Sequence, residues 1–222
     1  MKKLPLGIQT FKEIIKSNYL YIDKTEYIYN LINEGKYYFI SRPRRFGKSL
    51  LISTLKEIFL GNKELFKDLW IYDKIEWEKY PVIHIDFSNI IYTESLEEFK
   101  KSLLKSIKDI ANEYNLELEY SNFRDCFQEL IRKLSNINQV VILIDEYDKP
   151  IINFIENLEI ARQNREILKN FYETIKANDK YIKFALLTGV SKFSKVSVFS
   201  GLNNLRDITL SEKFCKLLGY TH

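Results

Sequence analysis

Residues 41–49, which read Ser-Arg-Pro-Arg-Arg-Phe-Gly-Lys-Ser, constrain the fold of this chain more than any other stretch. An apolar and aromatic run over 37–40 precedes them, and apolar residues follow at helical spacing over 50–60. The pattern therefore predicts a strand, a tight loop and a helix. A loop that ends in Gly-Lys-Ser at a helix start is typical of a phosphate-binding loop. Its backbone N–H groups surround the phosphates, the Lys reaches the β and γ oxygens, and the Ser ligates Mg²⁺.

The loop departs from the usual pattern, G-x-x-x-x-G-K-[ST], at its first position. Arg42 stands where the pattern has Gly, so we expect the chain to enter this loop differently, with Pro43 stiffening it. The alternative is a basic surface turn before an amphipathic helix. The residues that we expect to surround a nucleotide's phosphates are Arg42, Pro43, Arg44, Arg45, Phe46, Gly47, Lys48, Ser49 and Leu50.

Strands and helices alternate along the rest of the chain. Residues 140–144 form the most β-branched run, which is typical of a central parallel strand covered on both faces. The strands that we expect are 37–40, 82–87, 140–144, 181–188 and, as a short fifth candidate, 207–210. Alternating strands and helices predict an α/β fold with a parallel central sheet of about five strands.

The strand over 140–144 ends in Asp145 and Glu146. Acidic residues there, after a phosphate-loop unit, match the Walker B arrangement, in which Asp145 would complete the Mg²⁺ site with Ser49. Glu146 would orient and deprotonate the water that attacks the γ-phosphate. The alternative is a solvated acidic pair, but the order of the two motifs favours a nucleotide site at the carboxyl edge of the sheet.

Other polar residues near this edge have two interpretations each. Thr188 ends the fourth strand and would reach the γ-phosphate if that strand lies between the two motif strands; otherwise it only ends a strand. Lys192, Lys195 and Arg206 are candidates for a cationic finger, although a solvated charge is the simpler interpretation of each. For Asp148 we favour a helix cap over a role in supporting magnesium.

Capping signals mark two further helices. Asp23 with Glu26 resembles a capping box before a helix that ends near Gly35, and Ser95 with Glu98 is a second capping box. We therefore interpret Asp23 as a cap and not as a catalytic residue.

The composition excludes several classes of site. The chain has 222 residues, a net charge of +4, two cysteines and two histidines, and this set assembles no zinc site at a recognisable spacing. Cys126 lies on an apolar helical face and is expected to be a buried thiol, and His84 is expected to be packed and hydrogen-bonded in its strand. No apolar run approaches the ~18 residues of a membrane span, so we expect a cytoplasmic protein without membrane contact.

Short motifs along nearly the whole chain resemble those of one family. They are Leu6-Gly7-Ile8-Gln9-x-Phe11, Tyr21-x-Asp23-Lys24-Thr25, Arg42-Pro43-Arg44-Arg45-Phe46-Gly47-Lys48-Ser49, Asp145-Glu146-Tyr147-Asp148, Thr188-Gly189-Val190 and Phe199-Ser200-Gly201-Leu202-Asn203-Asn204-Leu205. The family is the bacterial AAA-ATPase-like family, whose members often carry a C-terminal nuclease-like domain of the PD-(D/E)XK type. Within it, the missing first Gly of the phosphate loop is normal.

The resemblance implies a P-loop NTPase of AAA type, a three-layer sandwich with Mg²⁺ and ATP as cofactors. Lys48 and Ser49 would take the Walker A roles, Asp145 and Glu146 the Walker B roles, and Thr188 the sensor role, so that Lys48, Glu146 and Thr188 are catalytic. The resemblance divides the chain into a lead-in (1–35) near the adenine, an ATPase core (36–211) and the start of a truncated helical lid (212–222). No Pro-Asp followed by Asp/Glu-x-Lys is present, so no nuclease is expected in these residues.

Two functions follow from this resemblance. The first is Mg-dependent ATP hydrolysis, as the motor or switch part of a larger protein. The alternative is a nucleotide-binding switch or scaffold that does not hydrolyse ATP and acts through a partner or a missing C-terminal domain. Glu146 favours the enzyme, and the absent lid favours the binder. The resemblance leaves open whether the chain forms a homo-oligomer. It allows nucleic-acid binding only through the missing C-terminal domain.

Overall fold

The computed structural model describes residues 2–191 and 204–219. Its strands form one five-stranded sheet in the order β2-β3-β4-β1-β5, and every pairing in it is parallel. The strands are β1 (Tyr37–Ser41), β2 (Val82–Asp86), β3 (Val140–Asp145), β4 (Ile182–Gly189) and β5 (Arg206–Asp207). This sheet confirms the predicted α/β class with a parallel sheet of about five strands.

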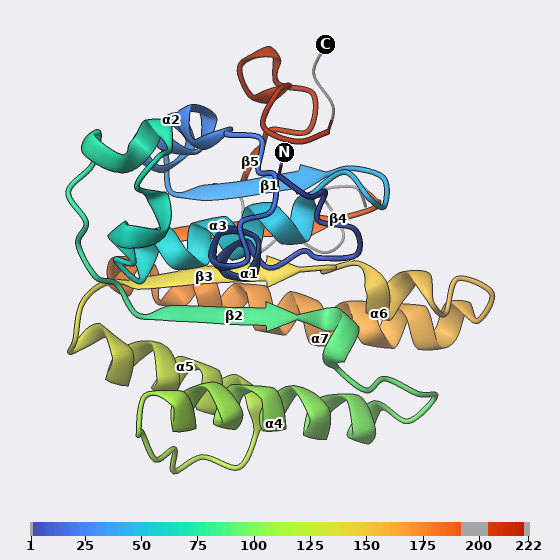
Figure 1. The fold of residues 1–222 in the computed structure, drawn as a ribbon. Coiled ribbons are helices and arrows are strands. Elements are labelled where there is room, and N and C mark those ends of the chain that lie inside the picture. The colour runs from blue at the N-terminus through green and yellow to red at the C-terminus, as the bar shows by residue number, and fades with distance from the viewer. Residues whose placement is uncertain (1, 192–203, 220–222) are drawn as a thin grey trace.

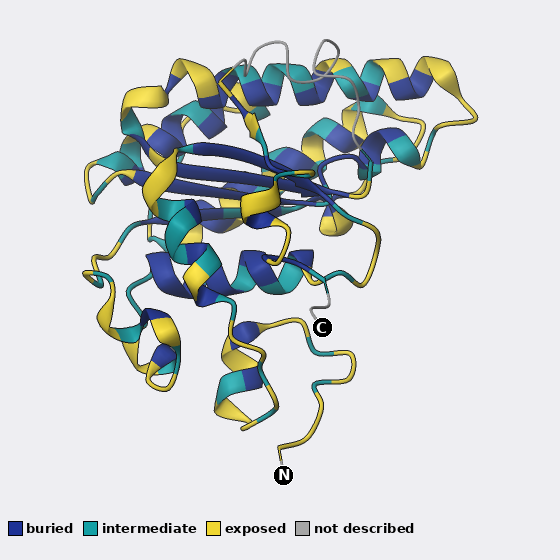
Figure 2. Cartoon of the chain, turned by 90° about the horizontal axis from the view of Figure 1, so that it is seen from above, coloured by how far each residue is buried: buried dark blue, intermediate teal, exposed yellow. Residues whose placement is uncertain are grey.

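Helices cover both faces of the sheet, which makes three layers (Figures 1 and 2). One face carries α1 (Phe11–Lys16), α2 (Thr25–Glu34) and α3 (Lys48–Phe59), and the other carries α4 (Leu96–Glu113), α5 (Phe123–Ser135) and α7 (Leu158–Ala177). The short α6 (Lys149–Ile152) follows β3 directly. Figure 2 shows the strands in the dark blue of buried residues between these layers, as expected for strands that read as continuous apolar runs.

Side chains of one strand alternate between the two apolar cores. In β1, Tyr37 and Phe39 pack in the core beneath α4, α5 and α7, whereas Tyr38 and Ile40 pack in the core beneath α3. Because the side-chain period of a strand is two residues, both faces of β1 must be apolar. The same two-sided burial holds β3, and with it the acidic residues that follow, in a fixed place.

One predicted strand boundary is wrong. The fifth strand covers Arg206–Asp207 and not 207–210. At Thr209, side chains replace the backbone bonds of a strand: Thr209 Oγ1 accepts from Ser41 N, and Thr209 N donates to Asp207 Oδ1. The long strand β4, in contrast, covers its predicted range closely.

The capping predictions are confirmed only in part. α2 begins at Thr25, and Asp23 Oδ1 accepts from Thr25 N and Oγ1, so Asp23 forms no capping box with Glu26. Ser95 does accept a hydrogen bond from Glu98 N, but the Glu98 carboxylate accepts from a neighbouring threonine hydroxyl and does not reach back to the cap. Gly35 ends α2 as predicted.

Neither cysteine forms a disulfide, and Cys126 is fully buried, as predicted. Burial raises the pKa of its thiol, which donates to Tyr120 O. His84 is packed in β2, but its buried Nε2 has no hydrogen-bond partner among the described residues, so that part of the prediction is wrong. Among the helices of these residues, none is long and apolar enough to cross a membrane.

Candidate functional site

The phosphate loop connects the carboxyl end of β1 to the first residue of α3. Gly47 precedes the helix with φ of +87°, and Leu51 N donates to Gly47 O as the helix begins. Arg45 also has a left-handed backbone, with φ of +67°. The left-handed residues of the loop are therefore Arg45 and Gly47, so the loop forms without a glycine at position 42.

Arg42 explains how the loop enters without its usual first Gly. Its N–H donates to Gly189 O (3.1 Å), which extends the pairing of β1 with β4 by one residue. Its guanidinium folds back, and Nη1 donates to Ser41 O (3.1 Å) and to Thr209 O. Arg42 thus joins the loop to the end of β4 through its backbone and to the segment after β5 through its guanidinium, and a glycine could make only the first of these contacts.

Lys48 lies inside this loop with 7% of its surface exposed. Its Nζ donates to Arg42 O (2.8 Å) and Pro43 O (2.9 Å). Burial lowers the pKa of the Lys48 ammonium, and the carboxylates of Asp145 and Glu146 oppose that shift. The loop's cation and the acidic end of β3 therefore lie close enough to interact electrostatically, as the two motifs predicted.

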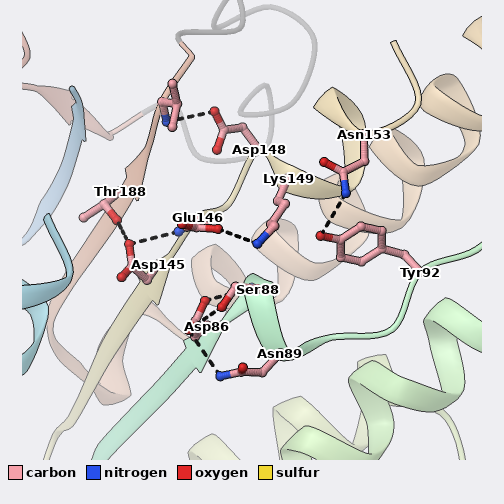
Figure 3. A network of polar contacts seen from close by, with 11 residues as sticks. Asp86, Ser88, Asn89, Tyr92, Asp145, Glu146, Asp148, Lys149, Asn153 and Thr188 are labelled. Carbon is pink, nitrogen blue, oxygen red and sulfur yellow. Dashed lines mark hydrogen bonds and ion pairs between the residues drawn. The ribbon is translucent and has the colours of Figure 1, made fainter. Parts of the chain in front are cut away.

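Asp145 ends β3 beside β4, because β4 lies between β3 and β1 as the Thr188 prediction required. Asp145 Oδ1 accepts from Thr188 Oγ1 and from Glu146 N (3.0 Å), and the residue is 3% exposed. The described residues donate no hydrogen bond to Asp145 Oδ2. Figure 3 shows these contacts as one row from Thr188 through Asp145 to Glu146.

Glu146 lies at the open end of the same row. Its backbone is left-handed, with φ of +52°, and its Oε2 is 2.9 Å from Lys149 Nζ on α6. Both side chains are about one third exposed (33% and 30%), so water screens this ion pair. The carboxylate predicted to act as a base is thus partnered, but by a cation that is itself partly exposed (Figure 3).

Asp148 occupies the N-cap position of α6 as predicted, but its side chain makes no capping hydrogen bond there. Its Oδ2 accepts instead from Val190 N (2.9 Å) and Ser191 N (2.6 Å), just beyond β4. Tyr147 N also donates to Thr188 O (3.0 Å). Burial raises the pKa of Asp148, and those two amides oppose the shift. The segment after β3 therefore holds the end of β4 at Thr188 and just beyond it.

The acidic residue at the end of β2, Asp86, belongs to a local turn. Asp86 is the register partner of Asp145, but its carboxylate accepts from Ser88 N, Ser88 Oγ and Asn89 Nδ2 (Figure 3). We assign Asp86 to the turn after β2 and not to the candidate site.

Of the three candidates for a cationic finger, the structure describes only Arg206, and it does not lie at this edge. Arg206 pairs with Tyr38 near the start of β1, and its guanidinium lies 3.8 Å from Glu34 Oε2. It therefore lies away from the carboxyl end of the strands. Lys192 and Lys195 lie outside the described residues, as does most of the motif over 199–205.

A magnesium ion fits the donors that remain. No cluster of three or more His, Cys, Asp or Glu side chains that could hold a metal occurs in residues 2–191 and 204–219. Mg²⁺ in nucleotide sites commonly uses one or two protein oxygens, with phosphate oxygens and waters as the other ligands. The Ser49 hydroxyl and Asp145 Oδ2 are the oxygens of that kind here.

An apolar pocket of about 470 Å³ lies beside the phosphate loop. Its walls come from the lead-in (within 4–28), from the loop and α3 (within 46–54) and from the C-terminal segment 217–219. Sequence analysis did not identify most of these residues, because they are ordinary apolar side chains from three distant segments. The only sequence signal was the resemblance, which placed the lead-in near an adenine.

A family model described as "Predicted AAA-ATPase" (AAA-ATPase_like) matches residues 5–199, most of the chain. The chain belongs to this family. The AAA-ATPase-like assignment agrees with the parallel sheet and with the loop between β1 and α3, and it supports nucleotide binding in general terms.

A curated relative of this AAA-ATPase-like chain comes from Azotobacter chroococcum mcd 1 and is described as "Uncharacterized protein in vnfD 5'region". The two are 45% identical over 225 residues, which cover 99% of this chain and 43% of the relative. The chain therefore spans less than half the length of that relative.

Proposed function

We propose that this chain binds Mg-ATP and hydrolyses it by in-line attack of water on the γ-phosphate. The observation that carries the proposal is the buried ammonium of Lys48, which interacts with the carboxylates of Asp145 and Glu146 across the carboxyl edge of the sheet. A loop cation and an acidic strand end at one edge are the two parts that phosphoryl transfer requires.

Each residue would take one role. Lys48 would leave the carbonyls of its own loop for the β- and γ-phosphate oxygens. Ser49 and Asp145 would hold Mg²⁺, which when bound neutralises charge on the phosphates. Glu146 would accept a proton from the attacking water, whose oxygen bonds to phosphorus as the bond from phosphorus to the leaving ADP oxygen breaks. Thr188, whose hydroxyl donates to Asp145, would accept a hydrogen bond from that water.

The pocket beside the loop supports ATP as the ligand. It is largely apolar and reaches Gly47 and Leu50, so a bound base would lie next to bound phosphates. We propose the pocket as the adenine site, with the lead-in as one wall.

A second function, nucleotide binding without turnover, is favoured by the ion pair between Glu146 and Lys149. A base held by a cation is not poised to accept a proton. A chain that keeps this pair with ATP bound would act as a switch.

Melting with and without Mg-ATP, together with steady-state turnover, tests both functions. Binding stabilises the folded chain by mass action, by on the order of 3 kcal/mol at a ligand concentration a hundredfold above Kd, and this raises the melting temperature. Lys48→Ala should abolish that rise. Glu146→Gln should lower turnover about 10²- to 10⁴-fold if Glu146 is the base. Glu156→Gln, at an exposed carboxylate, is the matched control. Binding with equal, negligible turnover in the parent, Glu146→Gln and Glu156→Gln would favour the switch, and absence of binding in the parent would overturn both functions.

A further inference from the structure

The motif Tyr21-x-Asp23-Lys24-Thr25 has no role in the phosphate site, yet the structure gives each of its polar residues a partner. Asp23 Oδ2 accepts from Trp70 N (2.7 Å), and Thr25 Oγ1 accepts from Ile71 N (3.2 Å). These bonds hold the start of α2 against the short helical turn Trp70–Asp73. Lys24, between them, is therefore presented from a fixed backbone.

Lys24 extends to the opposite wall of the apolar pocket. Its Nζ donates to Gly219 O at 2.6 Å, a contact between residues 195 positions apart. Burial lowers the pKa of the Lys24 ammonium. Because both Lys24 and Gly219 line the pocket, this hydrogen bond joins the lead-in wall to the C-terminal wall.

Gly219 in turn contacts the phosphate loop. Its N–H donates to Phe46 O at 3.0 Å, and its φ is +80°. A Cβ at this position would lie 3.2 Å from Phe46 Cδ1, closer than most such contacts. Gly219 thus accepts a hydrogen bond from the lead-in and donates one to the phosphate loop, and its backbone lies close to the Phe46 ring.

The same segment supplies apolar surface to the pocket. Leu217 and Leu218 are 2% and 6% exposed and both line it. Leu218 Cδ2 lies 3.9 Å from the place of a Cβ on Gly47, at the start of α3. These side chains therefore lie where the pocket meets the phosphate loop.

We propose that Lys24 is a positioning residue for base recognition: by holding Gly219, it keeps Leu217–Gly219 in place as the third wall of the base pocket. This inference rests on the proposed function. Among the described residues Lys24 donates no hydrogen bond to the phosphate loop and is linked to it only through Gly219, so we expect its effect to fall mainly on the base. The family motif would then serve to complete the pocket.

The test compares two ligands on the full 222-residue chain, Mg-ATP and Mg-tripolyphosphate, by titration of the melting temperature. Lys24→Met keeps the length of the side chain and removes the donor. We expect its affinity for ATP to fall about tenfold, as loss of a hydrogen bond from a charged donor predicts, while its affinity for tripolyphosphate stays within about twofold. Lys24→Arg should restore most of the ATP affinity, and Lys12→Met, at an exposed lysine of α1, is the matched control.

Each result decides between the two proposals. Equal loss of ATP and tripolyphosphate binding in Lys24→Met, or no loss of either, overturns this inference and leaves the proposed function standing. A parent chain that binds tripolyphosphate as tightly as ATP overturns the base pocket, and with it the role of Lys24. A parent chain that binds neither ligand overturns the proposed function itself.

Discussion

Thr188 donates a hydrogen bond to Asp145 Oδ1 across neighbouring strands β4 and β3, and both side chains are buried. Because the hydroxyl hydrogen is committed to the carboxylate, the oxygen lone pairs of Thr188 remain for other donors. The bond also fixes the rotation of the Asp145 carboxylate, so that Oδ1 is occupied while Oδ2 receives no hydrogen bond from the described residues. This hydrogen bond therefore supports one candidate site that the ends of β3 and β4 form together.

Thr188→Val removes that bond with little change in volume. We expect a loss of about 1–2 kcal/mol in the free energy of unfolding, because Asp145 loses a buried donor. Turnover should fall at least tenfold as the carboxylate becomes free to rotate. Denaturant unfolding and steady-state turnover measure the two effects. Thr174→Val, at a buried hydroxyl on α7, should change stability without a specific loss of turnover.

Asp148→Asn tests the carboxylate that accepts from Val190 and Ser191. Burial raises the folded pKa of Asp148, so the folded chain binds a proton more readily than the unfolded chain between the unfolded value near 3.9 and the raised value. The contribution of Asp148 to stability therefore improves as pH falls through that window and declines as pH rises.

The measurement is the difference in unfolding free energy between the parent and Asp148→Asn across pH 4 to 8. Relative to the variant, the parent should gain stability as pH is lowered from neutral, whatever other groups do in both chains. A difference independent of pH would mean that Asp148 titrates at its ordinary value.

Lys149→Met removes the cation from Glu146. Exposed ion pairs contribute about 0.2–1 kcal/mol, so the freed carboxylate should raise turnover by no more than about fivefold, with Mg-ATP affinity unchanged. Turnover of the parent and of Lys149→Met at saturating Mg-ATP measures this effect. A large fall would instead assign Lys149 to stabilisation of phosphate charge, a role that the resting ion pair does not reveal. Lys169→Met, at the α7 surface, is a suitable control.

The sequence predicted what local patterns determine. Two-sided apolar runs identified β1, β3 and β4, and the order of the motifs placed Lys48 and Asp145 at one edge. It could not predict that Asp148 accepts from Val190 and Ser191, because an Asp before a helix is more often a cap. Such contacts depend on how distant segments meet, which no local spacing encodes.

The same limit applies to the apolar pocket and to β5. Leu217 and Leu218 look like core residues of any helix, and only the fold brings them to Gly47. The β5 boundary depended on a side chain that competes with the strand ladder: Thr209 Oγ1 takes the N–H of Ser41. Side chains that pair with backbone groups commonly end regular structure in this way.

Gly189→Ala tests how closely the segment after β3 approaches the end of β4. A Cβ at Gly189 would lie 2.5 Å from both Cδ1 and Cε1 of Tyr147 and 2.8 Å from Asp148 Oδ1, so the ring and the carboxylate would both have to move. We expect a loss of about 1–3 kcal/mol in the free energy of unfolding, as for other overpacked sites.

Gly7→Ala separates this steric cost from a backbone cost. Gly7 has φ of +75° and nothing within 4 Å of its Cβ position, so alanine there should cost about 1 kcal/mol through the backbone alone. Gly189→Ala should also lower turnover, because the displaced residues flank Thr188, whereas Gly7→Ala should not. If Gly189→Ala kept full stability and turnover, the end of β4 would tolerate displacement and Thr188 would not need a fixed position on Asp145.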